Sequence, residues 1–416
     1  MLAARMHGYR QPLVLQEVNI PEISYDQVLV RVGGAGMCRS DVQLIDGYFQ
    51  EGIKPKFPLT PGHDIAGLVE ALGDRVPETA QLAVGDQVVV SAGWGDGTCR
   101  QCRAGNEQIC EHGSWPGFGP PGGYAEFIAG PYKELIRVEH RSKWEELAPL
   151  TDAGVTPYRG IKKLRAAGVL GPDRVMAVFG ASGLGSYAVQ YAKLLSSGST
   201  IVVFVRNEEK LATERERRAD YTINTHGKSL RDLRYELVKR VSKSKLDAVI
   251  DCVGAIETIQ TGFGLLATLG AFVSVGLVGN KIDIPLFPFV AGEFTYHGPL
   301  RANYSDLEEV LALAQQGKIR HSTKRIRFED INENLEMLRC GDIIGRAVII
   351  FDVKVNLSDR KDAKDATAPG REAPAKQALR RPKGSNPTTL LRGFIAVSFQ
   401  RLRFNYKIKI NYKIDS

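Results

Sequence analysis

Cysteine is scarce in this chain, with 6 residues among 416, and tryptophan and methionine are scarcer still. So few thiols exclude a small disulfide-stapled fold, and the length instead allows two or three domains with a hydrophobic core. Three of the cysteines fall within twelve residues of one another, which favours metal ligation over disulfides. A reducing, cytoplasmic location is therefore expected.

Export signals and uninterrupted apolar runs are also lacking. The first ten residues are polar and contain Arg5 and Arg10, unlike a signal peptide. The one long uncharged stretch, 258–280, has the length of a membrane span but contains five glycines. We therefore predict a helix ending at Gly270 followed by a buried strand over 271–277, and no membrane partner.

The chain has no basic surplus outside its last 63 residues. The formal net charge is +8, yet residues 354–416 carry 15 Lys and Arg against 5 Asp and Glu, and the rest carry 40 against 42. Charge therefore gives no reason to expect that the body of the chain binds nucleic acid or an anionic membrane.

The last 63 residues also differ in pattern. Residues 354–390 are rich in Lys, Arg, Asp, Ala and Pro without a periodic apolar face, which predicts a disordered linker. Residues 399–414 alternate apolar and basic side chains, which fits a weak nucleic-acid-binding arm and also a non-native extension. We favour the extension.

Two patterns divide the body of the chain. Residues 1–153 contain short β segments broken by glycine and proline, which predicts a β-rich domain. Residues 154–294 alternate strands and helices, with strands over 175–179 and 200–205 and a helix over 183–195 between them. This alternation predicts a doubly wound parallel sheet, and the expected fold class is α/β.

A local cluster of metal-ligating residues lies in a glycine-rich loop of the first domain. Its spacing, Asp96-x2-Cys99-x2-Cys102-x7-Cys110, can close tetrahedrally around Zn²⁺ and leave no open position, as in a structural site. Free surface thiols are the alternative, and Glu107 or a water is an alternative to Asp96 as fourth ligand.

A glycine-rich turn follows the first strand of the alternating region. The residues from 180 to 185, Gly180-Ala181-Ser182-Gly183-Leu184-Gly185, precede a predicted helix, so backbone amides at the helix start face a dinucleotide pyrophosphate. Ser182 stands at the usual middle glycine. A tight turn that binds nothing is the alternative.

Cofactor choice depends on the end of the second strand. NAD binding usually uses a carboxylate about 20 residues after the last glycine. Here that position is Val205, followed by Arg206, which can pair with a 2′-phosphate. The sequence therefore slightly favours NADP over NAD.

Together these motifs resemble the zinc-containing medium-chain alcohol dehydrogenases over essentially all of residues 1–353, the archaeal and bacterial secondary-alcohol enzymes above all. The run Gly62-His63-Asp64-x2-Gly67-x5-Gly73-x2-Val76 is similar to their zinc signature, with Asp64 where Glu is usual. The segments 85–90 and 150–154 look like the following strand and the third-ligand segment.

The resemblance implies a GroES-like catalytic domain formed by 1–153 and 295–353, with a Rossmann domain, 154–294, inserted between them. It also implies two zinc ions per chain. Cys38, His63 and Asp152 would hold the catalytic zinc, with a fourth position open for an alcohol that ionises to its alkoxide and passes hydride to NAD(P)+. Considered singly, the three residues also suit a buried apolar position, a turn histidine and a helix cap.

Further roles are implied by the same resemblance. Ser40 matches the hydroxyl that takes the alcohol proton, and Asp64 matches a second-shell or exchange ligand. Arg39 matches a pyrophosphate-binding arginine, and Arg346 resembles a second phosphate contact. Gln43 stands where family members often have a histidine, and an amide does not titrate.

We therefore expect a zinc- and NAD(P)-dependent dehydrogenase that oxidises a primary or secondary alcohol, or in reverse reduces an aldehyde or ketone. A sugar dehydrogenase of the same architecture is the alternative. A non-catalytic binding protein that uses the basic tail is the alternative from another class. A homo-oligomer, dimer or tetramer, is implied by the resemblance alone.

Overall fold

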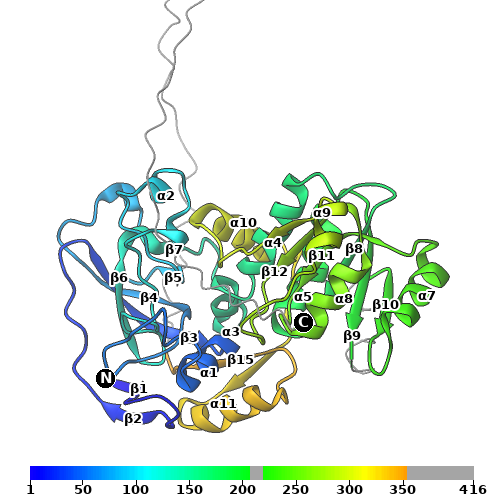
Figure 1. Ribbon diagram of the computed structural model, residues 1–416. Coiled ribbons are helices and arrows are strands. Elements are labelled where there is room, and N and C mark those ends of the chain that lie inside the picture. The colour runs from blue at the N-terminus through cyan, green and yellow to red at the C-terminus, as the bar shows by residue number, and fades with distance from the viewer. Residues whose placement is uncertain (207–218, 354–416) are drawn as a thin grey trace, which may run out of the picture. The chain divides into compact units, whose positions relative to one another are not determined.

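Two sheets organise the residues that the computed structural model describes, 1–206 and 219–353 (Figure 1). One sheet is built from both ends of this region and is mostly antiparallel, and the other is built from the middle and is parallel. The charged run over 208–218 continues the alternating pattern and predicts a further helix, but this segment and the tail from 354 lie outside the described residues.

The first sheet contains seven strands in the order β14-β15-β3-β4-β5-β7, with β6 also paired to β3. Only β14 and β15 pair in parallel. Because β15 pairs with the end of β3, the C-terminal segment completes a sheet that the N-terminal segment begins. The strands are β3 (Gln27–Gly36), β4 (Asp64–Leu72), β5 (Gln87–Val90), β6 (Phe127–Pro131), β7 (Leu135–Arg137), β14 (Thr323–Ile326) and β15 (Arg346–Ile350).

Short elements surround this sheet. A two-stranded hairpin precedes it, and alternate residues of β3, such as Val28 and Val30, are fully buried in its core. The hairpin and the flanking helices are β1 (Leu2–Arg5), β2 (Val14–Glu17), α1 (Arg39–Asp46), α2 (Arg100–Arg103), α3 (Trp144–Leu147) and α11 (Ile331–Cys340).

The second sheet is parallel throughout, in the order β10-β9-β8-β11-β12-β13, as the alternating pattern predicts. The chain runs outward from β8 to β10 and then returns to β11 on the other side of β8. Ligands of doubly wound sheets bind at the carboxyl ends of the strands at such a reversal. The strands are β8 (Val175–Phe179), β9 (Thr200–Val205), β10 (Tyr221–Asn224), β11 (Leu246–Asp251), β12 (Leu266–Ser274) and β13 (Thr295–His297).

Helices cover both faces of the parallel sheet (Figure 1). Met176 and Val178 of β8 join the core beneath α4, α5 and α10, whereas Ala177 and Phe179 join the core beneath α7, α8 and α9. This alternation follows from the two-residue period of a strand. The helices are α4 (Val155–Ala166), α5 (Gly183–Leu195), α7 (Leu230–Val241), α8 (Ile256–Leu265), α9 (Leu286–Ala291) and α10 (Tyr304–Gln315).

The uncharged stretch 258–280 differs from the prediction in its boundaries. Helix α8 ends at Leu265 and β12 begins at once with Leu266, so Gly270 lies within a strand. Pairing of Leu266 with Leu246 of β11 extends the strand towards its N-terminus, and such tertiary pairing overrides a local pattern. Among residues 1–206 and 219–353, no helix is long and apolar enough to span a bilayer.

Candidate functional site

Three segments far apart in the sequence bring Cys38, His63 and Asp152 together. Cys38 is the residue before α1, His63 precedes β4, and Asp152 follows a short 3₁₀ turn that leads into α4. All three side chains are buried. The sequence could not prove that they meet, and the structure brings their ligand atoms within 4.8 Å of one another.

The spacing of these atoms suits a zinc ion. The Cys38 Sγ lies 3.3 Å from the Asp152 Oδ2, and the His63 Nε2 lies 3.5 Å from the same oxygen. Tetrahedral zinc, with bonds of about 2.0–2.3 Å, separates its ligand atoms by about 3.3–3.8 Å. A thiolate, an imidazole and a carboxylate at this spacing fit Zn²⁺ with one position left open.

A carboxylate that the sequence analysis did not single out orients His63. The His63 Nδ1 donates to the Asp41 Oδ1 at 3.0 Å, and Tyr124 Oη and the backbone N of Cys38 donate to Oδ2 at 2.7 and 2.9 Å. Burial opposes ionisation of Asp41, but His63 and these donors outweigh it and lower its pKa. Asp41 therefore leaves the Nε2 of His63 free to bind a metal.

Asp64 lies beside this cluster in an ion pair with Arg346. The Arg346 Nη2 donates to the Asp64 Oδ2 at 2.7 Å and lies 3.5 Å from the Asp152 Oδ2. Burial, with Asp152 adding repulsion, raises the pKa of Asp64 to about 6, although Arg346 opposes the shift. A Cβ on Gly36 would lie 2.7 Å from Asp64 atoms, so only glycine admits this carboxylate here.

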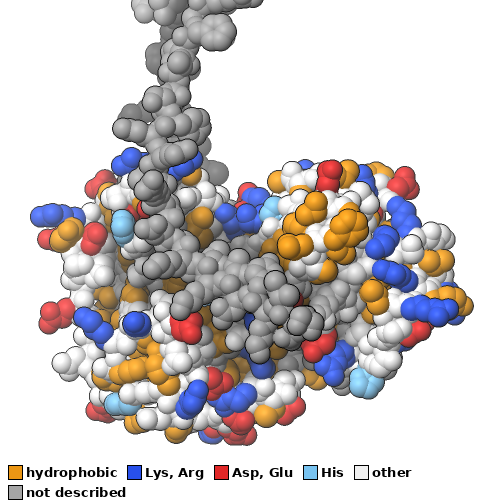
Figure 2. Space-filling view, viewed as in Figure 1, with side chains coloured by type: hydrophobic (Ala, Val, Ile, Leu, Met, Phe, Trp, Pro, Cys, Tyr) orange, Lys and Arg blue, Asp and Glu red, His pale blue; other side chains and the backbone are white. Residues whose placement is uncertain are grey.

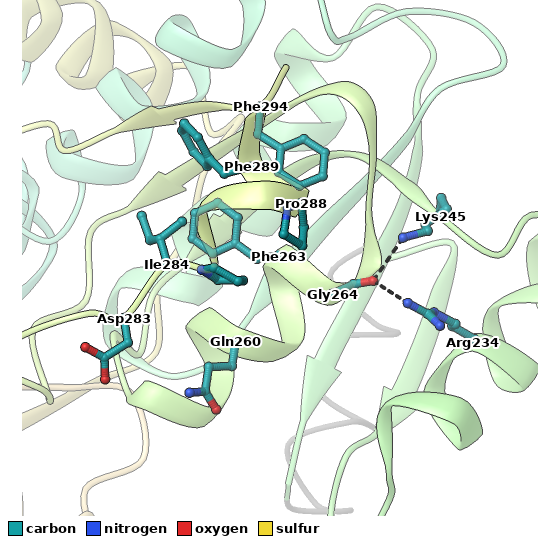
Figure 3. A pocket seen from close by; sticks show the side chains of 11 residues that line it. Arg234, Lys245, Gln260, Phe263, Gly264, Asp283, Ile284, Pro288, Phe289 and Phe294 are labelled. Carbon is teal, nitrogen blue, oxygen red and sulfur yellow. Dashed lines mark hydrogen bonds between the residues drawn. The ribbon is translucent and has the colours of Figure 1, made fainter. Parts of the chain in front are cut away.

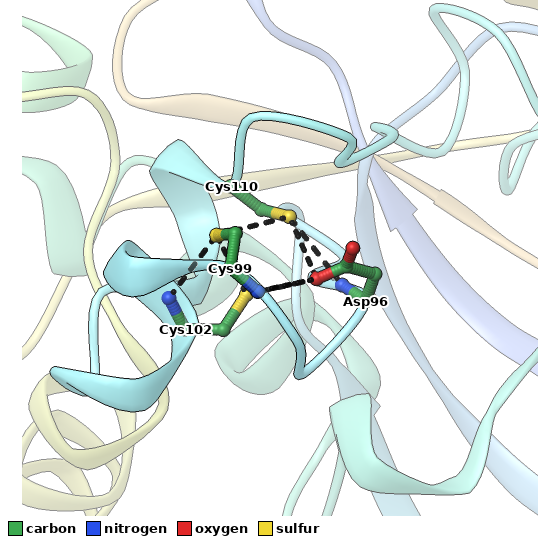
Figure 4. Close-up of side chains that lie close together, drawn as sticks. All are labelled: Asp96, Cys99, Cys102 and Cys110. Carbon is green, nitrogen blue, oxygen red and sulfur yellow. Dashed lines mark hydrogen bonds between the residues drawn. The ribbon is translucent and has the colours of Figure 1, made fainter.

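The cysteine loop forms a second cluster of ligand atoms (Figure 4). The Cys99 Sγ lies 3.6 Å from that of Cys102 and 3.7 Å from that of Cys110. The Asp96 Oδ1 lies 3.6 Å from the Cys102 Sγ and 3.3 Å from the Cys110 Sγ. These separations also suit tetrahedral zinc, and four protein ligands leave no position open.

Hydrogen bonds in this loop favour the ionised forms of Asp96 and Cys99, which are the forms that bind a cation. The side chain and backbone N of Thr98 donate to Asp96 and lower its pKa. The backbone N of Cys102 donates to the Cys99 Sγ, which lowers the pKa of that thiol to about 7. Asp96, rather than Glu107, faces the sulfurs, and Glu107 accepts a hydrogen bond from the backbone N of Tyr304 instead.

The glycine-rich turn lies at the carboxyl end of β8 and leads directly into α5, which begins at Gly183. A Cβ on Gly185 would lie 1.8 Å from the Gly180 carbonyl oxygen, so glycine is required for this close approach. Ser182 directly precedes the helix, and Leu184 lines a cavity shared with the first cluster. At the end of β9, Val205 is buried and Arg206 is exposed.

Helix α1 contains three further residues that the sequence analysis discussed, Arg39, Ser40 and Gln43. Ser40 Oγ lies 3.2 Å from the His63 Nε2, and Arg39 Nη1 donates to the carbonyls of Leu338 and Arg339 at 3.2 and 3.0 Å. Gln43 donates to the Leu277 carbonyl, across to the parallel-sheet side. All three line the same cavity.

The cavity has a volume of about 730 Å³ and reaches from the first cluster to the parallel sheet. Cys38 and Asp152 contribute to one part of its wall, and the rings of Phe49, Trp115 and Phe118 contribute to another. Its walls combine aromatic rings, side chains of the first cluster and residues at the carboxyl ends of the parallel strands. The cavity therefore has room for a small molecule between the first cluster and the glycine-rich turn.

A separate pocket of about 590 Å³ lies at the end of α8, below α9 (Figure 3). Arg234 and Lys245 both donate to the Gly264 carbonyl, at 2.8 and 3.1 Å, opposite the rings of Phe263 and Phe294. Cations at a helix C-terminus stabilise the helix end. Arg234 and Lys245 therefore stabilise the end of α8.

Known proteins resemble this chain over most of its length. The family model described as "Alcohol dehydrogenase GroES-like domain" matches residues 24–140, and "Zinc-binding dehydrogenase" matches residues 183–316. An NAD-dependent alcohol dehydrogenase of Saccharolobus solfataricus is 37% identical over 84% of this chain and 100% of its own length. A D-arabinose 1-dehydrogenase (NADP(+)) of that organism is 33% identical over 83% and 97%.

A solved structure is similar over the same region. The alcohol dehydrogenase of Aeropyrum pernix matches with a TM-score of 0.78 and 34% identity, over 84% of this chain and 100% of that one. The likeness therefore extends over both sheets and not over one motif alone.

Proposed function

The chain belongs to the zinc-containing medium-chain alcohol dehydrogenases, and from that premise we propose that it catalyses reversible hydride transfer between a primary or secondary alcohol and NAD(P)+. The convergence of Cys38, His63 and Asp152 on a cavity that reaches the glycine-rich turn carries this proposal. NAD-dependent alcohol dehydrogenases that align over 84% of this chain support it.

Cys38, His63 and Asp152 would hold the catalytic zinc. Bound zinc supplies Lewis acidity that lowers the pKa of an alcohol hydroxyl, and the nicotinamide accepts the hydride. Asp41 holds the imidazole in the tautomer that presents Nε2. Arg346 balances the charge of Asp64 beside the ligands, and the apolar rings of the cavity exclude water from the reacting carbon.

Ser40 is the proposed first acceptor of the alcohol proton. Its hydroxyl lines the cavity beside the ligand atoms, and a hydroxyl can accept one proton while it passes on another. Gln43 cannot continue this relay because an amide does not titrate and its side-chain NH₂ is bonded to the Leu277 carbonyl. The onward proton route therefore bypasses position 43.

The turn formed by Gly180, Ser182, Gly183, Leu184 and Gly185 is the proposed pyrophosphate site, because backbone amides at the start of α5 face an anion. Arg39 and Arg346 are proposed as phosphate contacts. A Cβ on Gly183 would lie 3.4 Å from the Arg346 Nη1, so that guanidinium is near the turn. Val205 and Arg206 favour NADP over NAD.

We also propose two zinc ions per chain, the second held by Asp96, Cys99, Cys102 and Cys110. This site has no open position and therefore stabilises its loop instead of binding substrate. The proposed domain organisation is a GroES-like domain of 1–153 with 295–353 around a Rossmann domain of 154–294.

Metal analysis with a substrate panel tests the proposal. We expect two zinc ions per purified chain and turnover of simple alcohols with NADP+ or NAD+. Cys38→Ser should remove turnover while Cys340→Ser, which changes an exposed cysteine outside both clusters, leaves it unchanged. Full activity of the Cys38→Ser protein would refute the assignment.

A sugar dehydrogenase is the second candidate, and the D-arabinose dehydrogenase relative is the observation that favours it. The same panel separates the two. Greater kcat/KM for aldoses than for simple alcohols would replace the alcohol assignment with the sugar assignment.

A homo-oligomer in a reducing cytoplasm is proposed as the working state. Strand β13 is the edge of the parallel sheet, and nearby α9 exposes Leu286, Phe287 and Val290, of which Phe287 is 82% exposed. Figure 2 shows hydrophobic side chains gathered where Figure 1 has α9. An apolar surface beside an unpaired edge strand suits a second copy of the chain.

A further inference from the structure

Arg301 is a buried cation in the substrate cavity that neither the zinc site nor the cofactor site requires. It lies between β13 and α10, is 8% exposed, and lines the cavity together with Cys38 and Asp152. Its guanidinium carbon lies 5.4 Å from the ring centre of Phe118 and 5.6 Å from that of Trp115. The charge therefore lies close to two aromatic rings and to the ligand residue Asp152.

The hydrogen bonds of Arg301 leave part of its guanidinium unused. Its Nη1 donates to the Ala92 carbonyl, and its Nε lies 3.8 Å from the Asp152 Oδ1, too far for a hydrogen bond. Among residues 1–206 and 219–353, the bond to Ala92 is the one hydrogen bond that this guanidinium forms. The Nη2 of the guanidinium is therefore available to donate to a ligand.

The nearest counter-charge of Arg301 is Asp152, and Cys38, Asp64 and Asp41 also attract its charge. Asp152 is the one carboxylate among the residues that line the cavity, against the two arginines Arg39 and Arg301. The Asp152 Oδ2 already faces Cys38, His63 and Arg346, so a metal held there would take most of its charge.

A buried arginine is costly to a fold unless its charge and its N–H donors are satisfied. The aromatic rings of Phe118 and Trp115 attract the cation but do not neutralise it. A planar carboxylate suits the free edge of the guanidinium because two parallel N–H donors match two carboxylate oxygens.

We propose that Arg301 binds a carboxylate of the substrate, so that the preferred substrates are hydroxycarboxylates and not neutral alcohols. This inference rests on the proposed dehydrogenase function. The hydroxyl of such a substrate would bind beside Cys38, His63 and Asp152, where a zinc ion would be held, and its carboxylate would turn towards Arg301.

Paired substrates of equal chain length test the inference with the zinc-loaded enzyme. We expect 4-hydroxybutanoate and 6-hydroxyhexanoate to have at least tenfold higher kcat/KM than 1-butanol and 1-hexanol, which is about the strength of one charge-assisted hydrogen bond. Arg301→Met should lower the values for the hydroxycarboxylates at least tenfold and change those for the alcohols less than threefold. Arg301→Lys keeps the charge and should give intermediate values.

A matched control removes a positive charge elsewhere. Arg327 has a 76% exposed side chain, lies outside the cavity and pairs with Asp330. Arg327→Met should leave both substrate classes unchanged. Zinc content and melting temperature of each variant show whether it folds, and Arg301→Lys keeps the test usable if Arg301→Met does not fold.

Binding without turnover gives an independent measurement. Calorimetric titration of the zinc enzyme with 4-hydroxybutanoate, in the absence of a nicotinamide cofactor, should show a Kd at least tenfold weaker for Arg301→Met than for the unchanged chain. The affinity should also fall with added salt, because an ion pair is screened.

Three results would overturn the inference: preference for the neutral alcohols, preference for aldoses, or an equal loss for both substrate classes in Arg301→Met. An equal loss would mean that Arg301 only holds Asp152. Absence of turnover with every alcohol and hydroxycarboxylate, with either nicotinamide cofactor, would instead refute the proposed dehydrogenase function. In that case the calorimetry still decides the role of Arg301.

Discussion

The His63 Nδ1 donates to the Asp41 carboxylate at 3.0 Å, and this bond determines which nitrogen faces Cys38 and Asp152. Asp41→Asn keeps the size of the side chain but weakens the charge-assisted bond. We expect zinc affinity at this site to fall about 10–100-fold, as for other partners of metal-bound histidines. Zinc retention after dialysis against a graded chelator measures the change.

The second zinc site provides the control for Asp41→Asn. One zinc should remain bound under conditions that remove the other, because Asp96, Cys99, Cys102 and Cys110 do not contact Asp41. Loss of both zinc ions in parallel would indicate general unfolding and would contradict the positioning role of Asp41.

Ligand substitutions in the two clusters should have separable effects. Cys38→Ser weakens a ligand that supports catalysis, so we expect turnover to fall about a thousandfold while the melting temperature changes little. Cys99→Ser opens the closed site, and a loss of about 2 kcal/mol would lower the melting temperature by about 4–8 °C. Thermal unfolding and steady-state kinetics of both variants measure the two effects separately. Equal thermal destabilisation by the two substitutions would argue against the distinction.

Arg206 should distinguish the two nicotinamide cofactors. Arg206→Ala is expected to weaken NADP binding by about 1.5–3 kcal/mol, through loss of a charge-assisted contact with the 2′-phosphate, and to leave NAD binding nearly unchanged. Fluorescence titration with each reduced cofactor measures both affinities. If the two affinities fell by the same factor, Arg206 would not read the phosphate.

Glu134 should make stability depend on pH. Its Oε1 accepts a hydrogen bond from the backbone N of Gly95 at 2.9 Å, and burial raises its pKa to about 7, with Glu107 adding repulsion and Lys133 opposing it. The folded chain therefore holds this proton more tightly than the unfolded chain. The contribution of Glu134 to stability is greatest below pH 4.5 and is lost as the pH rises to about 7.

Glu134→Gln removes this dependence and keeps an acceptor for Gly95. Relative to the unchanged chain, we expect the variant to be more stable at pH 8, by up to about 3 kcal/mol, and nearly equal at pH 4.5. Denaturant unfolding at the two pH values measures the difference. A gain of equal size at both would mean that the carboxyl group does not titrate in this range.

The sequence predicted the elements whose signals are local. The strands over 175–179 and 200–205 and the helix over 183–195 have the predicted bounds, because buried β-branched runs and the glycine-rich turn delimit them. In the β-rich part, the short β segment that the sequence indicates over 124–128 is displaced, since β6 begins at Phe127 where pairing with β3 begins. Partner strands determine such boundaries, and they lie far away in the sequence.

The same distinction applies to the site. The four residues of the cysteine loop lie within fifteen positions, so spacing alone indicated a metal site. Asp41 carries a weak local signal, three residues after Cys38 at a helix start, whereas Arg301 carries none. Arg301 lies in the segment between β13 and α10 and comes near Asp152 only when the chain is folded, which no local pattern indicates.

Strand β15 pairs with β3 and brings Arg346 to Asp64. During synthesis from the N-terminus, the proposed zinc ligands up to Asp152 therefore emerge almost two hundred residues before the guanidinium that balances their neighbour. Until then residues 34–36 of β3 have no partner from β15, and Asp64 lacks its counter-ion. All strands of the parallel sheet precede β15 in the sequence, so this sheet can be complete before the first sheet closes.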